Sequence, residues 1–149
     1  MKNSTRLHVL PIAAALLITV TQTSCTREAK KERSLDSALK YFDKGEFAAA
    51  EIEYKNAMGA DPGNSEAIKR LGIIRTRQGA NFEAAGLLTL AKRKLPTDNE
   101  VAIQLAKALT GLGFVPDARK ELLELLDRSP DSGDALMLLA EISVRPDWI

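Results

Sequence analysis

Few side chains in this 149-residue sequence are suited to covalent or acid–base chemistry. The chain has one histidine, His8, and one cysteine, Cys25, and both stand near the N-terminus. A catalytic nucleophile needs a base within hydrogen-bond reach. We expect His8 to be removed with an export signal and Cys25 to be modified, so these residues do not predict a catalytic pair.

Pairs of carboxylates are the remaining candidates for acid–base catalysis. Glu51 with Glu53, and Glu121 with Glu124, place two acids close together in the sequence. General acid–base catalysis needs such groups in a cleft, whereas acids on a helix surface commonly pair with nearby Lys or Arg. No glycine-rich phosphate loop and no cluster of metal-ligating residue types accompanies them. We therefore expect no enzyme, no cofactor and no metal site.

The N-terminal segment 1–24 has the features of an export signal. Lys2 and Arg6 precede an apolar run over residues 9–20, and small polar residues lead up to Cys25. A helix that spans a membrane needs ~20 apolar residues, which is more than this run supplies. We predict that residues 1–24 are a signal peptide that is removed.

The position of Cys25 resembles the lipobox of bacterial lipoproteins. There, a cysteine directly after small residues such as Thr23 and Ser24 is acylated and becomes the first mature residue. Gln22 departs from the pattern, which usually has an aliphatic residue three places before the cysteine. The resemblance implies lipidation of Cys25 at the cell envelope, with the periplasmic side of the outer membrane favoured because Thr26 rather than Asp follows. The alternative is a soluble secreted or periplasmic protein whose cysteine is incidental.

Residues 25–33 are expected to form a lipid-anchored linker. The stretch 26–33 is charged and polar and reaches at most ~28 Å when extended, so the folded domain would lie near the bilayer. Its basic side chains could touch anionic headgroups. Glu28 and Glu32 dilute that charge, which favours a solvated tether or a fraying first helix.

The composition of the chain after the predicted signal limits the kinds of partner that it can bind. A chain of 149 residues with 45% apolar and 5% aromatic content fits one modest domain of helix-forming residues. The formal net charge is +1, and the part after the signal is nearly neutral. Nucleic-acid affinity depends on an excess of basic residues, so we expect no nucleic-acid partner.

From about residue 34 the sequence repeats with a period of 34, which indicates a repeat architecture. Four columns of small residues or prolines share this spacing: Gly45, Gly79 and Gly113; Ala50, Ala84 and Ala118; Pro62, Pro96 and Pro130; and Ala38, Gly72, Ala106 and Ala140. Glycine permits the positive φ at a turn between two helices, and alanine permits close helix contact. Proline ends a helix, and Asn64 and Asp98 then offer caps for the next one. Pro116 fits the first turn of a second helix.

These columns resemble tetratricopeptide repeats over about residues 34–144. The first repeat carries most of the family's pattern: Ala38, Tyr41, Gly45, Phe47, Ala50, Tyr54, Ala57 and Pro62. The third departs from it at Leu125, where Ala is usual. The resemblance implies an all-α solenoid of helix–turn–helix repeats at about 31–64, 65–98 and 99–132, followed by an unpaired helix at 133–144 and a tail at 145–149.

The resemblance also implies a groove, lined mainly by the first helix of each repeat, that binds a peptide or protein segment. The family's groove positions fall on Leu39, Phe42, Asp43, Lys69, Ile73, Arg77, Ile103, Lys107 and Thr110. Apolar side chains beside these cations suit a partner segment with hydrophobic and acidic residues. The alternative is that these are ordinary exposed or intrahelical residues.

One kind of ligand is disfavoured by the same resemblance. Chaperone-binding members grip a C-terminal carboxylate with Lys, Asn and Arg at set positions, which here hold Leu35, Leu39, Arg70, Glu100 and Gln104. We therefore predict a non-enzymatic interaction scaffold at the envelope that does not use this clamp.

The C-terminal helix at 133–144 is apolar over much of its surface, although a repeat array needs a polar last helix. An alternative function follows: a structural subunit that docks or forms a homo-oligomer through this helix. A further alternative is the front part of a longer repeat protein. Exposed apolar area of this kind marks an interface or an aggregation hazard.

Overall fold

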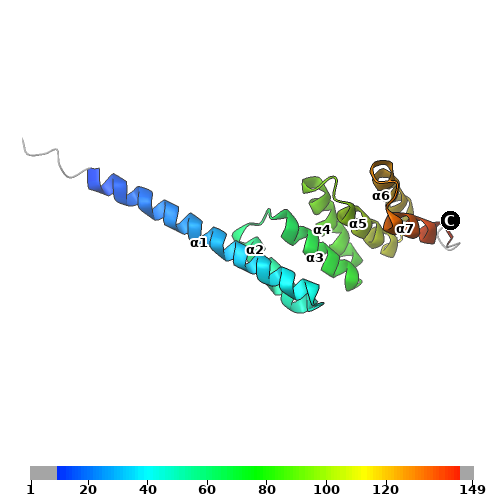
Figure 1. The fold of residues 1–149 in the computed structure, drawn as a ribbon, viewed down its shortest axis with the longest axis horizontal. Coiled ribbons are helices and arrows are strands. Elements are labelled where there is room, and N and C mark those ends of the chain that lie inside the picture. The colour runs from blue at the N-terminus through cyan, green and yellow to red at the C-terminus, as the bar shows by residue number, and fades with distance from the viewer. Residues whose placement is uncertain (1–9, 145–149) are drawn as a thin grey trace, which may run out of the picture.

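The computed structural model describes the backbone of residues 10–144 and the side chains from residue 26 onward. This part of the chain contains seven α-helices and no strand, which confirms the predicted all-α repeat fold (Figure 1). The helices are α1 (Leu10–Asp43), α2 (Phe47–Ala60), α3 (Ser65–Arg77), α4 (Asn81–Lys94), α5 (Asn99–Gly111), α6 (Val115–Arg128) and α7 (Gly133–Val144).

Some predicted features fall outside this part of the chain. The start of the predicted signal at 1–9, the tail at 145–149 and the side chain of Cys25 lie outside the described residues. Among the helices that are described, none combines the length and the apolar character needed to cross a membrane.

Neighbouring helices pack in chain order as a stack of pairs. α1 pairs with α2, α3 with α4 and α5 with α6, and α7 packs on α5 and α6. α3 also contacts α5, and α5 contacts α7, so these three helices lie side by side. The N-terminal half of α1 extends far beyond the body formed by the other helices (Figure 1).

The repeated glycines form the turns within the pairs. Gly45, Gly79 and Gly113 have φ angles of 76°, 74° and 81°, in the left-handed region that suits glycine. After Gly79, the amide of Ala80 donates to the carbonyl of Arg75 at 3.0 Å, which closes the end of α3. The predicted use of this glycine column is confirmed.

Prolines and caps separate the pairs as predicted. Each second helix ends two residues before Pro62, Pro96 or Pro130. The Asn64 side chain then accepts a hydrogen bond from an amide of α3, and Asp98 does the same for α5. These bonds satisfy amides that a helix start otherwise leaves unpaired. Pro116 lies in the first turn of α6.

The fourth column marks close helix contacts. Ala38 and Ala106 are fully buried, and a Cβ added to Gly72 would lie 2.7 Å from Cγ of Leu88. α3 and α4 can therefore approach this closely only without a side chain at position 72. Ala140 occupies the same column in α7 but is exposed, because no helix of the described chain covers it.

Leu125, the departure from the family pattern, has a packing role. It is fully buried and belongs to one apolar cluster with Leu122, Leu138 and Ile142. The larger side chain therefore fills the space between α6 and α7, where the family usually has alanine.

Of the two forms expected for residues 26–33, a solvated tether or the start of the first helix, the structure has the helix. Residues 25–33 are helical and continue directly into the first repeat as part of α1. At the helical rise of 1.5 Å per residue, the stretch 26–33 spans only ~12 Å rather than ~28 Å. Lys31 pairs with Glu28, and its Nζ lies 3.8 Å from a carboxylate oxygen of Asp61, which connects α1 to the end of α2.

Candidate interaction groove

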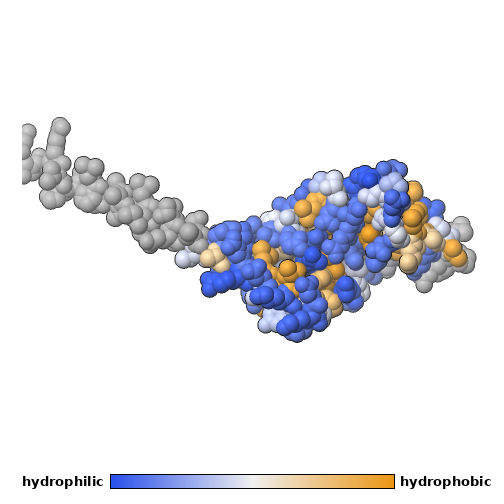
Figure 2. Space-filling view, in the orientation of Figure 1, coloured by the Kyte–Doolittle hydropathy of each residue, from blue (hydrophilic) through white to orange (hydrophobic). Residues whose placement is uncertain are grey.

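The exposed sides of α1, α3, α5 and α7 form one continuous surface, here called the first-helix face. Positions separated by whole repeat periods coincide on it, so Leu39 and Lys107 occupy equivalent places in α1 and α5. Leu39 is 44% exposed, and Lys107 is exposed and makes no ion pair among the described residues. Figure 2 shows hydrophobic side chains gathered between α1 and α3 and again over the α5–α7 end.

A hollow of about 400 Å³ lies on this face between α5 and the start of α7. It is lined by Asn99, Glu100, Ile103, Gln104, Lys107, Ser132 and Asp134. Two of the predicted groove residues, Ile103 and Lys107, are therefore brought together at one depression, with acids and amides around them. This mixture suits hydrogen bonding to a peptide segment rather than enclosure of a small apolar ligand.

Between α1 and α3 the face presents the Phe42 ring and two guanidinium groups, with Phe47 beside them at the start of α2. The Phe42 ring packs edge to face against Phe47, with centroids 5.5 Å apart. The Arg77 guanidinium lies 5.0 Å from the Phe47 ring centroid, and that of Arg70 lies 4.9 Å from the Phe42 centroid. Cations over aromatic faces at these distances are attracted by the ring quadrupole. Arg77 is exposed and makes no ion pair within the described chain, so its charge remains available.

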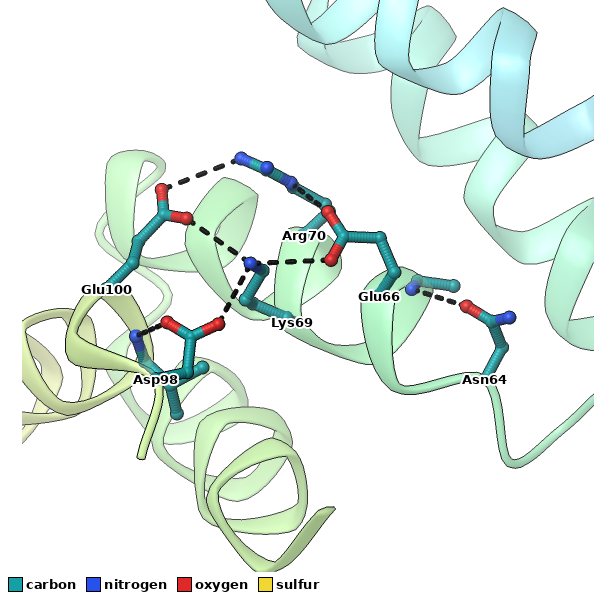
Figure 3. Close-up of polar contacts among 8 residues, drawn as sticks. Asn64, Glu66, Lys69, Arg70, Asp98 and Glu100 are labelled. Carbon is teal, nitrogen blue, oxygen red and sulfur yellow. Dashed lines mark hydrogen bonds and ion pairs between the residues drawn. The ribbon is translucent and has the colours of Figure 1, made fainter. Parts of the chain in front are cut away.

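Lys69 forms ion pairs with acids of its own chain (Figure 3). Its Nζ lies 3.1 Å from Asp98, 3.3 Å from Glu66 and 3.5 Å from Glu100. Burial lowers the pKa of Lys69, but the hydrogen bond to Asp98 and the surrounding acids outweigh this effect and raise the pKa above its ordinary value. The lysine is therefore charged and neutralised by its own chain.

The same acids hold Arg70. Its Nε lies 2.6 Å from Glu66, and its Nη1 lies 3.5 Å from Glu100. Burial raises the pKa of Asp98, yet hydrogen bonds from the Val101 amide and Lys69 lower it overall. The cluster thus joins α3 to the beginning of α5 and presents little free positive charge.

These contacts correct part of the predicted groove. Lys69 is only 8% exposed and its charge is satisfied, so it cannot serve as a free cation for a partner. Ile73 is fully buried, because it packs with Leu88 and Leu105 in the middle of the array, where neighbours cover it on both sides. Ile103 is 8% exposed and lines the hollow.

The other predicted groove residues remain on or near the surface. Leu39, Asp43, Arg77 and Lys107 are exposed, and Phe42 is half-buried. The Thr110 hydroxyl oxygen is buried and, within the described chain, has no hydrogen-bond partner.

Two of the acids in Figure 3, Glu66 and Glu100, follow a sequence pattern that the groove prediction did not use. Glu66 and Glu100 stand one repeat period apart, and Asp134 at the hollow continues the series. Each lies near the start of a first helix, where a negative charge is favoured by the helix dipole. The recurrence of an acid every 34 residues could therefore have indicated, from the sequence, that nearby cations are neutralised.

Three of the four carboxylates considered for catalysis, Glu51, Glu121 and Glu124, form ion pairs. Glu51 accepts two hydrogen bonds from the Arg75 guanidinium at 2.6 and 2.8 Å. Glu121 and Glu124 both contact the Lys92 ammonium, at 2.5 and 3.0 Å. These acids therefore link neighbouring repeats, as expected for acids on helix surfaces.

Solved structures with a similar fold include interaction domains and part of an enzyme. The first tetratricopeptide repeat domain of Spaghetti (RPAP3), bound to an HSP90 peptide, has a TM-score of 0.71 and 23% identity, covering 77% of this chain and 91% of that one. The second such domain of human RPAP3, in complex with an HSP70 peptide, has a TM-score of 0.70 and 18% identity, covering 82% and 99%. At these identities the likeness concerns the fold alone.

A mutant O-GlcNAc transferase from Thermobaculum terrenum is 26% identical, with a TM-score of 0.71. The match covers 78% of this chain but only 22% of the transferase. No curated protein gave a match. The tetratricopeptide repeat family model matches residues 35–99 and 103–145, which is most of the chain. Together with the 34-residue period, the glycine turns and the stacked helix pairs, this match shows that the chain belongs to the tetratricopeptide repeat family.

Proposed function

We propose that this protein is a non-enzymatic interaction scaffold of the bacterial cell envelope that binds a partner segment along its first-helix face. The observation that carries the proposal is the pair of unneutralised cations, Arg77 and Lys107, on the same face as exposed Leu39 and half-buried Phe42. A segment with apolar side chains and carboxylates would complement this surface. The hollow beside Lys107 provides a place for one such side chain.

The chemistry of the face argues against a bound C-terminal carboxylate of the chaperone type. Arg70, at one of the clamp positions, is paired with Glu66 and Glu100. Glu100 itself occupies another of these positions and adds negative charge beside the hollow. Acidic side chains of a partner would therefore meet Arg77 and Lys107 instead of a carboxylate clamp.

Attachment to the envelope belongs to the same proposal. The sequence before Cys25 supports export, and the lipobox-like position of Cys25 supports acylation, with the periplasmic side of the outer membrane as the favoured location. The soluble secreted or periplasmic form is the alternative. Mass spectrometry of the mature N-terminus tests this directly: a diacylated or triacylated Cys25 peptide is expected, and an unmodified N-terminus elsewhere in the chain would contradict it.

Partner binding is tested by crosslinking a C-terminally tagged full-length protein in its host cells, followed by mass spectrometry of the adducts. We expect a recurrent envelope protein that is lost in the double variant Arg77→Glu, Lys107→Glu. The matched control is Arg93→Glu, Lys120→Glu, which reverses two exposed charges on second helices. Equal loss in both variants, or no loss in either, would remove the first-helix face as the binding surface.

A second function is favoured by the surface of α7. Leu136 and Met137 are 49% and 72% exposed, whereas the equivalent positions of α5, Ala102 and Ile103, are 3% and 8% exposed. α7 therefore presents the face that a further helix covers elsewhere in the array. The alternative proposal is a structural subunit that docks or self-associates through this face, or that continues into further repeats.

The two functions predict different stoichiometry. Self-association through α7 would appear as a dimer or larger species of the full chain by light scattering, and Met137→Glu would abolish it. Leu123→Glu is the control, because Leu123 is 48% exposed on α6. A monomer that still crosslinks to an envelope partner would leave only the scaffold function.

A further inference from the structure

We infer that the surface where α1 emerges from the body is a docking site for anionic lipid headgroups. This surface, here called the basal surface, consists of Arg27, Lys30 and Arg33 of α1 with Lys55 of α2. The inference rests on the proposed membrane attachment and adds an orientation to it. A hydrophilic surface near the point where α1 joins the body is visible in Figure 2.

The cations and acids of this part of α1 lie on different sides of the helix. Arg27, Lys30 and Arg33 are spaced three residues apart and are exposed, so they form one stripe along α1. At about 100° per residue, Glu28 and Glu32 fall on another side of the helix. The acids therefore do not neutralise the stripe in the way that the linear sequence suggests.

One acid of this segment already pairs with a lysine outside the stripe. Glu28 pairs with Lys31, which also faces Asp61 at the end of α2. Arg27 and Lys30 make no ion pair among the described residues. Their charges are thus available to a partner, in contrast to the neutralised cluster around Lys69.

α2 completes the basal surface, which contains two depressions. One depression of about 280 Å³ is lined by Arg27, Lys30, Lys55, Asn56, Gly59 and Ala60. A second, of about 350 Å³, is lined by Lys30, Arg33, Ser34, Ser37 and Glu53. Lys55 pairs with Glu51 but its side chain remains 60% exposed. The first depression combines three cations with small or polar groups, a combination that suits a phosphate group, whereas Glu53 adds a carboxylate to the second.

Position favours a bilayer over an acidic protein as the partner. Lys30 is five residues beyond Cys25 on a continuous helix, which corresponds to ~8 Å of axial rise. Arg27 and Lys30 would therefore lie within about a Debye length of the headgroups to which Cys25 is proposed to be anchored, and Arg33, at ~12 Å, would lie slightly farther away. Each Lys or Arg near an anionic surface strengthens binding about fivefold. The chain has a net charge of only +1, so a generally basic surface does not account for this cluster.

The test uses the full-length chain with vesicles of phosphatidylcholine alone and with vesicles of phosphatidylcholine mixed with anionic phosphatidylglycerol. Flotation measures attachment, and labelling of lysines with an amine-reactive reagent, followed by mass spectrometry, measures contact. We expect Lys30 and Lys55 to be labelled at least about threefold more slowly on the anionic vesicles, because these charges approach the headgroups. Lys107 and Lys120, which lie far along the array, should be unchanged. Raising the salt concentration should reverse the protection.

The variant Arg27→Glu, Lys30→Glu should lose the protection of Lys55, whereas Arg119→Glu, Lys120→Glu on α6 should keep it. Flotation with both vesicle types but equal labelling of Lys30 and Lys55 would overturn the inference while leaving membrane attachment intact. If the protein floats with anionic vesicles only, and the variant Arg27→Glu, Lys30→Glu does not float, the basal surface is supported. The same result would count against a lipid anchor that acts independently of this surface. Flotation with neither vesicle type would overturn both.

Discussion

Lys69 illustrates at the residue scale how a cation at a predicted binding position can serve the fold instead. The repeat pattern places it on the first-helix face, but three carboxylates from α3 and the start of α5 surround it. Two of these acids, Asp98 and Glu100, are far from Lys69 in the sequence. Helix periodicity identifies which side of a helix a residue occupies, and it does not identify the partner that a later helix supplies.

Removing the Lys69 charge should destabilise the protein. The variant Lys69→Met keeps the length of the side chain but removes the ammonium that contacts Asp98 at 3.1 Å, while Arg70 still contacts Glu66 and Glu100. We expect the free energy of unfolding to fall by about 2 kcal/mol, because the partly buried Asp98 carboxylate loses its counterion. Urea denaturation followed by circular dichroism measures this change. Lys107→Met, at an exposed unpaired position, should stay within about 0.5 kcal/mol of wild type; equal stability of the two variants would contradict the role of the cluster.

Glu51 should make stability depend on pH in the acidic range. Hydrogen bonds from Arg75 and Lys55 lower the pKa of Glu51 to about 2, from an ordinary value of 4.5. A lowered folded-state pKa contributes stability that is fully present above pH 4.5 and is lost as the pH falls towards 2. Glu51→Gln should therefore be less stable at pH 7 by about 1–2 kcal/mol and should lose less stability than wild type between these pH values.

The measurement for Glu51 is a series of urea midpoints between pH 7 and pH 2. Glu141→Gln is the control, because Glu141 is exposed and makes no ion pair in the described part of the chain. Parallel pH curves for wild type and Glu51→Gln would show that the pairing with Arg75 does not control acid stability.

At the scale of elements, each helix boundary follows from local residues. Gly79 takes a φ of 74° to end α3, and Asn64 caps its start. These preferences act within one turn of helix, so they can be predicted from a short stretch of sequence. The length of α1 is different: residues 25–33 have enough helix-forming side chains to continue the first repeat helix, although their charges suggest a tether.

Two glycines should respond in opposite directions to alanine. In Gly79→Ala the added Cβ meets no neighbour within 4 Å, so the cost is the left-handed backbone, about 1 kcal/mol. Gly86 lies inside α4 with ordinary φ and equally open surroundings, so Gly86→Ala should stabilise the protein by about 0.5–1 kcal/mol. Thermal unfolding of both variants provides the comparison. A gain in stability for both would contradict the assigned turn conformation at Gly79.

The whole molecule is a linear stack, and perturbations should remain local in it. Each repeat contacts mainly its neighbours, so stability is shared between adjacent pairs rather than over one central core. α7 has apolar residues on its outer side, Leu136 and Met137, that no helix of the described chain covers.

Leu125→Ala should loosen this end of the stack. Leu125 is fully buried in the cluster that holds α7, and the truncation should cost about 3 kcal/mol through lost contacts and a cavity. Hydrogen exchange with mass spectrometry should show faster exchange in α6 and α7, with α2 and α3 nearly unchanged. Leu123→Ala, at a half-exposed position of α6, should have little effect. Uniformly faster exchange throughout the chain would indicate a single cooperative unit instead of a stack.

The sequence by itself determined the architecture. The period of 34, the glycine turns, the buried alanines and the prolines are local features that recur, and together they predicted the helix pairs and their boundaries. Gly45, Gly79 and Gly113 are sufficient to place three turns, because backbone conformation at each depends only on adjacent residues.

Only the tertiary structure decided which of these residues a partner can reach. Lys69 and Arg77 belong to the same helix and have the same charge, yet distant acids neutralise the first, while the second lies exposed over an aromatic ring. Ile73 is buried and Leu39 is not, although both occupy the same place in the repeat, because α1 lies at the edge of the stack and α3 has neighbours on both sides. Exposure and charge pairing depend on contacts between separate repeats, and a periodic sequence does not specify these contacts one residue at a time.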